Sequence, residues 1–277
     1  MNVLSLFDGM SCGQIALDRL GIKVENYYAS EIDKYAIKIA QKNYPNTIQL
    51  GDIKNVKGED LPNIDLLLAG SPCQGFSFAG KQLAFDDPRS ALFFEFIRLL
   101  EEVKPKYFLL ENVRMKKEYL DVITDLVGVE PILINSALVS AQNRLRYYWT
   151  NLPVDGQPED KGLVLKDILD PSATNFLSKT TAMRSRTQRN VRETTDKANT
   201  LTATGYKGSQ SNGVTVVADS GRTKWRILTL LECERLQTVP DSYTEGVSNT
   251  QRYKMLGNGW TVDVISHILK GVHDGSS

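Results

Sequence analysis

The sequence has few cysteines and histidines and no long apolar run. Its 277 residues include three cysteines, Cys12, Cys73 and Cys233, and two histidines. Three cysteines cannot form a framework of paired disulfides, and the sequence contains no Cys-x-x-Cys pair or Cys/His cluster typical of zinc sites. The longest apolar run, 64–70, is interrupted by Asp65 and falls far short of the ~18 residues that indicate a membrane span. We therefore expect a cytoplasmic protein without a metal site or a membrane partner.

Net charge is also absent, but the charges are unevenly distributed. The chain has 33 basic and 33 acidic side chains, and 41% of its residues are apolar, which is typical of a globular protein. Between Phe176 and Arg226 there are ten Lys and Arg residues and only three acidic residues. A neutral protein with one strongly basic stretch can bind a polyanion there, although a solvated basic surface has the same composition.

Short β-type runs alternate with helical patterns through the first 150 residues. We expect strands at 2–6, 26–30, 47–50, 65–69, 107–110, 131–136 and 146–150. We expect helices at 12–20, 34–42, 90–103 and 117–126. This alternation predicts an α/β fold with a doubly wound, mostly parallel sheet. Ligands of such sheets bind beyond the carboxyl ends of the strands, so the reactive residues should lie there.

The alternating pattern stops near residue 153. Pro and Gly interrupt the chain there, and a basic segment rich in Ser, Thr and Asn follows, with strand-like runs only at 200–204 and 214–218. Helical patterns return at 228–236 and 260–272. We therefore divide the chain into a first domain at 1–152, a small loop-rich lobe at 153–225, and a return segment at 226–277 that completes the first domain.

Three acidic residues follow three successive predicted strands. The first strand leads into Phe7-Asp8-Gly9, a glycine turn where nucleotide-like cofactors meet α/β sheets. The turn lacks the Gly-x-Gly-x-x-Gly pattern, and Asp8 would repel a pyrophosphate but suits a positively charged cofactor without phosphates. Glu31 is placed to hold a ribose diol, and Asp52 to accept a hydrogen bond from an adenine amino group. Any one of them alone is commonly a capping or turn residue; together they indicate a ligand such as S-adenosylmethionine.

The ends of later strands carry residues suited to nucleophilic chemistry. Pro72-Cys73-Gln74 follows the fourth strand and presents a thiol at the carboxyl edge, so we interpret Cys73 as a nucleophile and the other two cysteines as small buried apolar residues. Glu111 ends the next strand, where a carboxyl can hold or deliver a proton. Arg144 and Arg146 alternate at the start of another strand, so we expect them to converge on one anion or carbonyl.

Together these motifs resemble the cytosine-carbon-5 DNA methyltransferases. The resemblance covers the chain apart from the basic lobe, and it rests on ordered blocks: Phe7-Asp8-Gly9, Glu31, Gly51-Asp52, Gly70-Ser71-Pro72-Cys73-Gln74, Glu111-Asn112-Val113, Gln142-x-Arg144-x-Arg146, Arg226-x-Leu228-Thr229 with Glu232, Arg235-Leu236-Gln237, and Gly257-Asn258. Any one block is weak, but their order makes the match specific. Phe7-Asp8-Gly9 and Gly259-Trp260 are similar to the catalytic domains of animal de novo enzymes and their bacterial or phage relatives.

The resemblance implies a covalent mechanism. The Cys73 thiolate would attack carbon 6 of a cytosine flipped out of duplex DNA, while Glu111 protonates or hydrogen-bonds ring nitrogen 3. Carbon 5 would then take the methyl group of S-adenosylmethionine and leave S-adenosylhomocysteine. Arg146, with Arg144, would hold the cytosine carbonyl. The implied cofactor contacts are Phe7, Asp8, Gly9, Met10, Cys12, Glu31, Ile32, Asp52, Ile53, Pro72, Leu92, Asn258 and Trp260.

The same resemblance makes the basic lobe a target-recognition lobe. Phosphates and base edges would be contacted by Arg184, Arg186, Arg189 and Arg192. A loop from Gln74 to Arg89 would close over the flipped base, with DNA contacts from Gln74, Ser77, Lys81, Gln82 and Arg89. The implied partners are double-stranded DNA and, in a bacterial or phage host, a cognate restriction enzyme. The shortness of the lobe favours a short recognition sequence.

Three other functions are weighed against this one. One branch of the resembled family methylates transfer RNA, and composition does not separate the two substrates. A catalytically silent DNA-binding paralogue is disfavoured because Cys73, Glu111, Arg144 and Arg146 are all present. A dinucleotide-dependent dehydrogenase is disfavoured by Asp8 and by the missing glycine motif.

Overall fold

The computed structural model describes residues 1–71, 91–174, 176–177, 191–205, 207, 214–218 and 225–274. The chain forms two compact units that interleave along the sequence. Unit 1 comprises Met1–Ile134, Leu145–Gly156 and Ser266–Ser277, and unit 2 comprises Asn135–Arg144 and Gln157–Ile265. In the part of the chain that is described, no helix is both long and apolar enough to cross a membrane.

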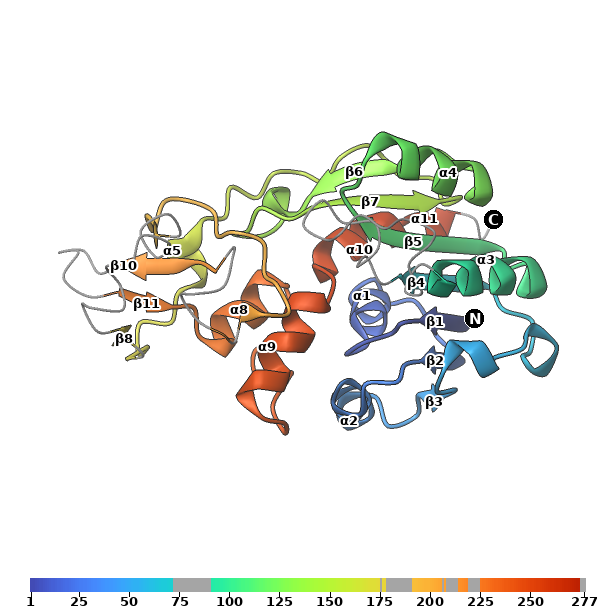
Figure 1. Cartoon of the computed structure of the whole chain (residues 1–277), viewed down its shortest axis with the longest axis horizontal. Coiled ribbons are helices and arrows are strands. Elements are labelled where there is room, and N and C mark those ends of the chain that lie inside the picture. Colours follow the sequence, from blue (N-terminus) through green and yellow to red (C-terminus); the bar gives the residue numbers. More distant parts are fainter. Residues whose placement is uncertain are drawn as a thin grey trace. The chain divides into compact units, whose positions relative to one another are not determined.

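Unit 1 is built on a seven-stranded sheet with the order β3-β2-β1-β4-β5-β7-β6 among the described residues (Figure 1). The strands are β1 (Asn2–Leu6), β2 (Asn26–Ser30), β3 (Ile48–Gln49), β4 (Leu66–Gly70), β5 (Tyr107–Val113), β6 (Ile132–Asn135) and β7 (Leu145–Thr150). Neighbours from β3 to β5 are parallel, whereas β7 runs antiparallel to β5. The predicted doubly wound, mostly parallel sheet is confirmed.

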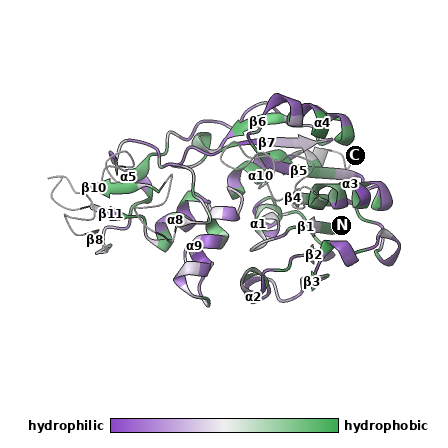
Figure 2. Ribbon diagram, viewed as in Figure 1, coloured by the Kyte–Doolittle hydropathy of each residue, from purple (hydrophilic) through white to green (hydrophobic). Residues whose placement is uncertain are grey.

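Helices connect the strands of unit 1. They are α1 (Cys12–Arg19), α2 (Lys34–Asn43), α3 (Ala91–Val103) and α4 (Lys117–Val127), with short 3-10 turns η1 (Ile53–Asn55) and η2 (Gly58–Asp60). The predicted helices at 12–20, 34–42, 90–103 and 117–126 agree with these bounds to within one residue at each end. Figure 2 shows polar and apolar residues mixed along α3 and α4, as expected for amphipathic helices that cover a sheet.

Burial on both faces explains the apolar runs of the central strands. Leu67 of β4 and Leu110 of β5 pack with Phe93 and Phe96 of α3 in one buried cluster. The alternate residues of these strands are buried as well. In β4, the four residues from Leu66 to Ala69 are all inaccessible to solvent. A central parallel strand therefore needs apolar residues at every position.

Unit 2 contains a second, smaller sheet and most of the C-terminal helices. Its strands, in the order β8-β11-β10-β9, are β8 (Phe176–Leu177), β9 (Val191–Arg192), β10 (Val216–Ala218) and β11 (Trp225–Ile227). Its helical segments are η4 (Ser136–Leu138), α5 (Leu165–Ile168), α8 (Leu230–Leu236) and α9 (Asn249–Asn258), followed by α10 (Val262–Leu269), which ends in unit 1, and α11 (Gly271–Asp274) of unit 1.

Two expectations for the C-terminal half are corrected, and one helix was not predicted. No strand forms at 200–204, because the Thr202 carbonyl accepts a 3.0 Å hydrogen bond from the Gly205 amide and closes a turn. The single helix expected at 260–272 is two helices, α10 and α11. Helix α9 was not predicted, because only Met255, Leu256 and Gly257 of its residues are buried and no apolar stripe marks it.

Candidate active site at the carboxyl edge of the sheet

Glu111 and Arg146 form an ion pair at the end of β5. The strand register places Glu111 opposite Tyr148 and Val113 opposite Arg146. Because side chains alternate along a strand, Glu111 and Arg146 project from the same face of the sheet. Arg146 Nε lies 2.9 Å from Glu111 Oε1, and the side chains keep only 14% and 11% of their exposure. The antiparallel course of β7 is what brings its first residues to the edge where β5 ends.

The segment that leads to Cys73 begins beside this pair. Gly70, the last residue of β4, is the register partner of Glu111. The buried Ser71 hydroxyl accepts a 2.9 Å hydrogen bond from Asn112 Nδ2. Pro72 and Cys73 themselves lie outside the described residues, so the nucleophilic role of Cys73 stays a prediction.

Arg146 pairs with Glu111, whereas Arg144 contacts main chain, so the convergence of the two arginines on one target stays a prediction. The buried guanidinium of Arg144 donates to three main-chain carbonyls of unit 2, those of Leu201 at 2.9 Å, Gly257 at 3.2 Å and Gly259 at 2.8 Å. Arg144 directly precedes β7, and Arg146 is the second residue of that strand. The geometry gives Arg144 a role in holding main chain.

The loop after β1 is tied to the end of β2. Gly9 adopts a left-handed φ of 59°, and its N–H donates a 2.8 Å hydrogen bond to Glu31 Oε2. The other carboxylate oxygen of Glu31 accepts hydrogen bonds from the N–H groups of Ile32 and Asp33, both at 2.8 Å. Three backbone N–H groups therefore fix the position of the Glu31 carboxylate.

Two further residues predicted for the cofactor lie at this edge. Ile32 is 74% exposed, and an apolar side chain so exposed beside a fixed carboxylate is suited to cover a flat ring. Asp52 follows β3, the strand next to β2, and its Oδ1 accepts a 3.1 Å hydrogen bond from the Lys54 N–H. The Ser30 hydroxyl donates to the Gly51 carbonyl at 2.8 Å, which holds the ends of β2 and β3 together. The structure thus brings Glu31, Ile32 and Asp52 to one edge.

Asp8 is held by hydroxyl groups of the protein. The Ser11 hydroxyl donates to Oδ2, and the Tyr27 hydroxyl donates to Oδ1 at 2.8 Å. Burial raises the pKa of Asp8 to about 6 from an ordinary 3.8; the charge of Glu31 raises it too, whereas hydrogen bonds with Ser11, Ser5 and Tyr27 lower it. Asp8 is therefore ionised at neutral pH, and a negative charge at this position favours a cationic ligand.

Several other predicted cofactor residues belong to the core. Met10, Cys12 and Ile53 are buried, so a ligand would meet them mainly through their main chain. Phe7 and Leu92 are partly buried and pack against the core cluster of unit 1. The burial of Cys12, and of Cys233 in unit 2, confirms that both are small buried apolar residues.

Asn258 and Trp260, also predicted for the cofactor, belong to unit 2. They lie at the end of α9 and just after it. The backbone just before Asn258 is tightly packed, because a Cβ added to Gly257 would lie 2.1 Å from the carbonyl carbon of Thr202. Their contact with a cofactor stays a prediction.

Of the predicted DNA-contacting residues, only Arg192 is described. It lies in β9, and its Nη2 donates a 2.6 Å hydrogen bond to Asn199 Oδ1, which anchors it within unit 2. The others lie outside the described residues: Gln74, Ser77, Lys81, Gln82, Arg89, Arg184, Arg186 and Arg189. Their roles stay predictions.

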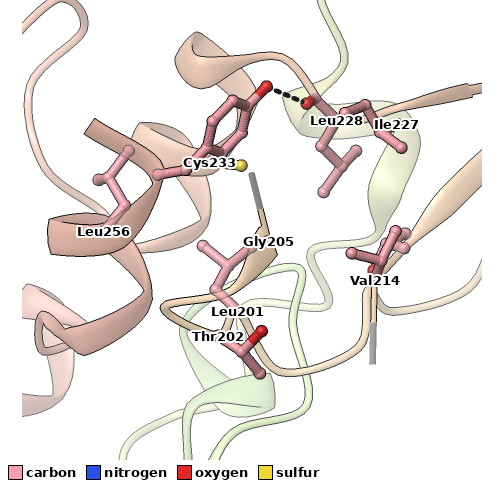
Figure 3. Close-up of a pocket in the computed structure, with 10 residues that line it drawn as sticks. Leu201, Thr202, Gly205, Val214, Ile227, Leu228, Cys233 and Leu256 are labelled. Atoms are coloured by element: carbon pink, nitrogen blue, oxygen red, sulfur yellow. Dashed lines mark hydrogen bonds between the residues drawn. The ribbon is translucent and has the colours of Figure 1, made fainter. Parts of the chain in front are cut away.

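Unit 2 contains a small, partly open apolar pocket of about 30 Å³ (Figure 3). Leu201 and Val214 contribute to its lining, with Cys233 and Tyr253. The Tyr253 hydroxyl donates to the Leu228 carbonyl at 2.8 Å, and burial raises the pKa of the Cys233 thiol well above its usual range. The thiol therefore stays protonated, and the lining offers no reactive pair comparable to Glu111 and Arg146.

Sequence reasoning missed the hydroxyls around Asp8, among them those of Tyr27 and Ser11. The spacing Asp8-x-x-Ser11 is a signal that could have indicated the second, because it places a hydroxyl within one turn of the carboxylate. Tyr27 carries no such signal. Its proximity to Asp8 depends on the pairing of β2 with β1, which places Tyr27 opposite Val3.

Comparison with known protein families and curated relatives gives consistent matches. A family model described as C-5 cytosine-specific DNA methylase matches residues 1–127 and 129–273. Type II methyltransferase M1.ScrFI of Lactococcus lactis subsp. cremoris is 30% identical over 304 residues, which cover 97% of this chain and 77% of the relative. Type II methyltransferase M.HhaI of Haemophilus parahaemolyticus is 29% identical over 311 residues, which cover 98% of this chain and 94% of the relative.

Solved structures agree on the fold. The Entamoeba histolytica methyltransferase EhMeth matches with a TM-score of 0.83 and 18% identity, covering 100% of this chain and 99% of that one. At this identity the likeness establishes the architecture of the chain.

Proposed function

Because the chain belongs to the C-5 cytosine-specific DNA methylase family, we propose that it transfers a methyl group from S-adenosylmethionine to carbon 5 of a flipped cytosine in double-stranded DNA. The observation that carries the proposal is the buried Glu111–Arg146 pair at the carboxyl edge of β5. Gly70, three residues before Cys73, is paired with Glu111 at that edge. A nucleophile, a carboxyl and a guanidinium are the groups that this reaction requires.

Cys73 acts on the cytosine ring in the proposed mechanism. Its thiolate forms a bond to carbon 6, and the electron pair of the ring double bond moves toward carbon 5, which becomes nucleophilic. After methyl transfer, a base takes the proton from carbon 5, the ring double bond re-forms and the sulfur leaves. The cytosine must be flipped out of the duplex, at a cost of a few kcal/mol.

Glu111 and Arg146 stabilise the charge that this attack creates. Glu111 hydrogen-bonds ring nitrogen 3 and holds a proton there, so that negative charge does not accumulate on the ring. Arg146 fixes the Glu111 carboxylate through Nε, donates from Nη1 to the Leu145 carbonyl at 2.9 Å, and offers Nη2 to the cytosine carbonyl. Arg144 acts from a distance, because its guanidinium holds the carbonyls of Gly257 and Gly259.

The residues at the β1–β3 edge fit S-adenosylmethionine. Glu31 offers a fixed carboxylate for a ribose diol, Ile32 an exposed apolar side chain for adenine, and Asp52 an acceptor for its amino group. Asp8 places a negative charge at the loop, which suits a sulfonium and an ammonium group and opposes a phosphate. When bound, S-adenosylmethionine supplies an electrophilic methyl group.

We also propose that 1–152 is the catalytic and cofactor-binding domain, that 153–225 recognises the target, and that 226–277 completes the catalytic domain. The ten basic residues between Phe176 and Arg226 support phosphate binding by the second part. A restriction enzyme as partner is supported by the type II methyltransferases among the relatives. A cytoplasmic location fits such a partner and substrate.

The test uses tritiated S-adenosylmethionine with mixed-sequence duplex DNA and, separately, bulk transfer RNA. The wild-type chain should label DNA at carbon 5 of cytosine, and Cys73→Ser should reduce labelling to background while retaining S-adenosylhomocysteine binding. Duplexes carrying 5-fluorocytosine at the target should become covalently attached to the wild-type chain. Labelling of transfer RNA alone, or full activity of Cys73→Ser, would contradict the proposal.

A further inference from the structure

We propose that Tyr27 is a positioning residue for the cofactor: its hydroxyl holds the Asp8 carboxylate, and Asp8 in turn fixes the turn that receives S-adenosylmethionine. The inference rests on the proposed function, because it assumes that this cofactor binds at the end of β1. It assigns a role to a residue that no sequence motif marks.

Tyr27 belongs to a buried chain of polar side chains beneath the turn. Its hydroxyl lies 2.8 Å from Asp8 Oδ1, and the Ser11 hydroxyl bonds the other oxygen. Gln14 Nε2 continues the chain, donating to Ser11 Oγ at 3.2 Å and to Thr47 Oγ1 at 2.8 Å. The polar chain therefore connects Tyr27 on β2 to the residue just before β3 by way of the turn.

The turn itself has a backbone that its surroundings must maintain. Phe7 and Ser11 have left-handed φ angles of 57° and 63°, which cost conformational energy for residues with a side chain. Asp8 lies between them, its amide donating to the Ser30 carbonyl at 3.2 Å and its carbonyl accepting from the Ser11 amide at 3.1 Å. A carboxylate held at both oxygens fixes the residue on which these contacts depend.

Tyr27 itself is 3% exposed. A residue with so little accessible surface acts on a ligand through Asp8 rather than by direct contact. Burial and the Asp8 charge raise the pKa of the Tyr27 hydroxyl well above its usual range, so it keeps its proton and can donate to Asp8. Its bond to Asp8 favours the ionised carboxylate.

This arrangement predicts a pH signature. The groups that face Asp8 are Ser11 in the turn, Ser5 on β1, Tyr27 on β2 and the Glu31 carboxylate. Without the Tyr27 hydroxyl, one bond that stabilises the ionised Asp8 is lost and its pKa rises. As the pH is lowered, the variant should therefore lose affinity for a cationic cofactor at a higher pH than the wild-type chain does.

The experiment compares Tyr27→Phe with Tyr28→Phe as matched control. Tyr28 is the next residue of the same strand and packs, half-buried, against the core cluster. Calorimetric titration of S-adenosylmethionine from pH 5.5 to 8.5 should show about tenfold weaker binding for Tyr27→Phe at pH 7.5, the loss typical of a hydrogen bond to a charged group. Binding by Tyr28→Phe should stay within about twofold of the wild type. Only in Tyr27→Phe should the loss of affinity on acidification begin at a higher pH.

A double-mutant cycle with Asp8→Asn separates positioning from general stability. If Tyr27 acts through Asp8, Tyr27→Phe should weaken binding no further in the Asp8→Asn background. Wild-type affinity in Tyr27→Phe, equal losses in both tyrosine variants, or independent losses in the double variant would overturn the inference. A wild-type chain that binds no S-adenosylmethionine would instead overturn the proposed function, and the inference with it.

Discussion

Arg146 Nε lies 2.9 Å from Glu111 Oε1, although the two residues come from strands that run in opposite directions. The end of β5 and the beginning of β7 meet at one edge, so a carboxylate and a guanidinium separated by 34 residues in the sequence form one group. The pair sits beside the start of the Cys73 segment, where the proposed chemistry needs it.

Glu111→Gln should lower kcat by at least about 100-fold, because an amide cannot hold the proton at ring nitrogen 3. Binding of S-adenosylhomocysteine, measured by calorimetry, should stay within about twofold. Arg146→Lys should also lower kcat, because an ammonium cannot reproduce the planar guanidinium contact. Unchanged kcat in Glu111→Gln would remove this residue from the mechanism.

Arg144→Met should destabilise the fold by about 2–4 kcal/mol, because buried carbonyls at Leu201, Gly257 and Gly259 lose their donors. The measurement is urea unfolding, and the exposed Arg114→Ala, expected within about 0.5 kcal/mol of wild type, is the control. An Arg144 variant that unfolds like the wild type yet loses activity would indicate a direct catalytic role.

Asp8→Asn should stabilise the ligand-free protein at neutral pH. The folded-state pKa of Asp8 is about 6, above the ordinary 3.8, so the folded chain binds this proton more tightly than the unfolded chain. Its contribution to stability is therefore present at low pH and lost as pH rises through 6. We expect a gain of about 1–2 kcal/mol at pH 8 that shrinks toward pH 5, measured by urea unfolding. A gain that does not vary with pH would contradict this assignment. The Asp8→Asn variant should also bind S-adenosylmethionine more weakly than the wild-type chain does.

Two ion pairs of similar length should differ greatly in energy. Glu232 is fully buried and accepts from Arg226 at 2.7 and 2.6 Å, whereas Asp121 pairs with Lys117 at 2.7 Å on the exposed face of α4. Glu232→Gln should cost about 3–5 kcal/mol, because it leaves a buried guanidinium without its counter-charge. Asp121→Asn should cost far less, because solvent screens an exposed pair. Thermal unfolding of both variants checks this, and equal losses would refute the role of burial.

The sequence was sufficient to predict the sheet of unit 1. Strands β1 and β2 match their predicted bounds. Central strands such as β4 are apolar runs buried on both faces, which leaves a clear pattern in the sequence. Glu31, Asp52 and Glu111 were predicted to follow strand ends. β2 ends directly before Glu31 and β3 ends three residues before Asp52, whereas β5 extends to Val113 and so includes Glu111, although its strand was expected to end at 110.

What the sequence did not predict depends on contacts between distant segments. The alternation of Arg144 and Arg146 gave no sign that Arg144 contacts carbonyls more than 50 residues away, at Leu201 and Gly257. The Tyr27 contact with Asp8 likewise depends on strand register. Helix α9 has no apolar stripe, and its neighbour α8 was predictable because Thr229 and Glu232 form a capping box.

The interleaving of the two units has a consequence for engineering specificity. The chain crosses between them after Ile134, Arg144, Gly156 and Ile265. Ser140 and Gln142, from the short first stretch of unit 2, both donate at 2.6 Å to the Leu236 carbonyl in its long second stretch. A recognition module excised as a continuous fragment would lose these donors. To exchange target preference between homologues, one should therefore transfer only an interior part of 157–265. The segment 135–144, which supplies these donors, should stay with the host protein.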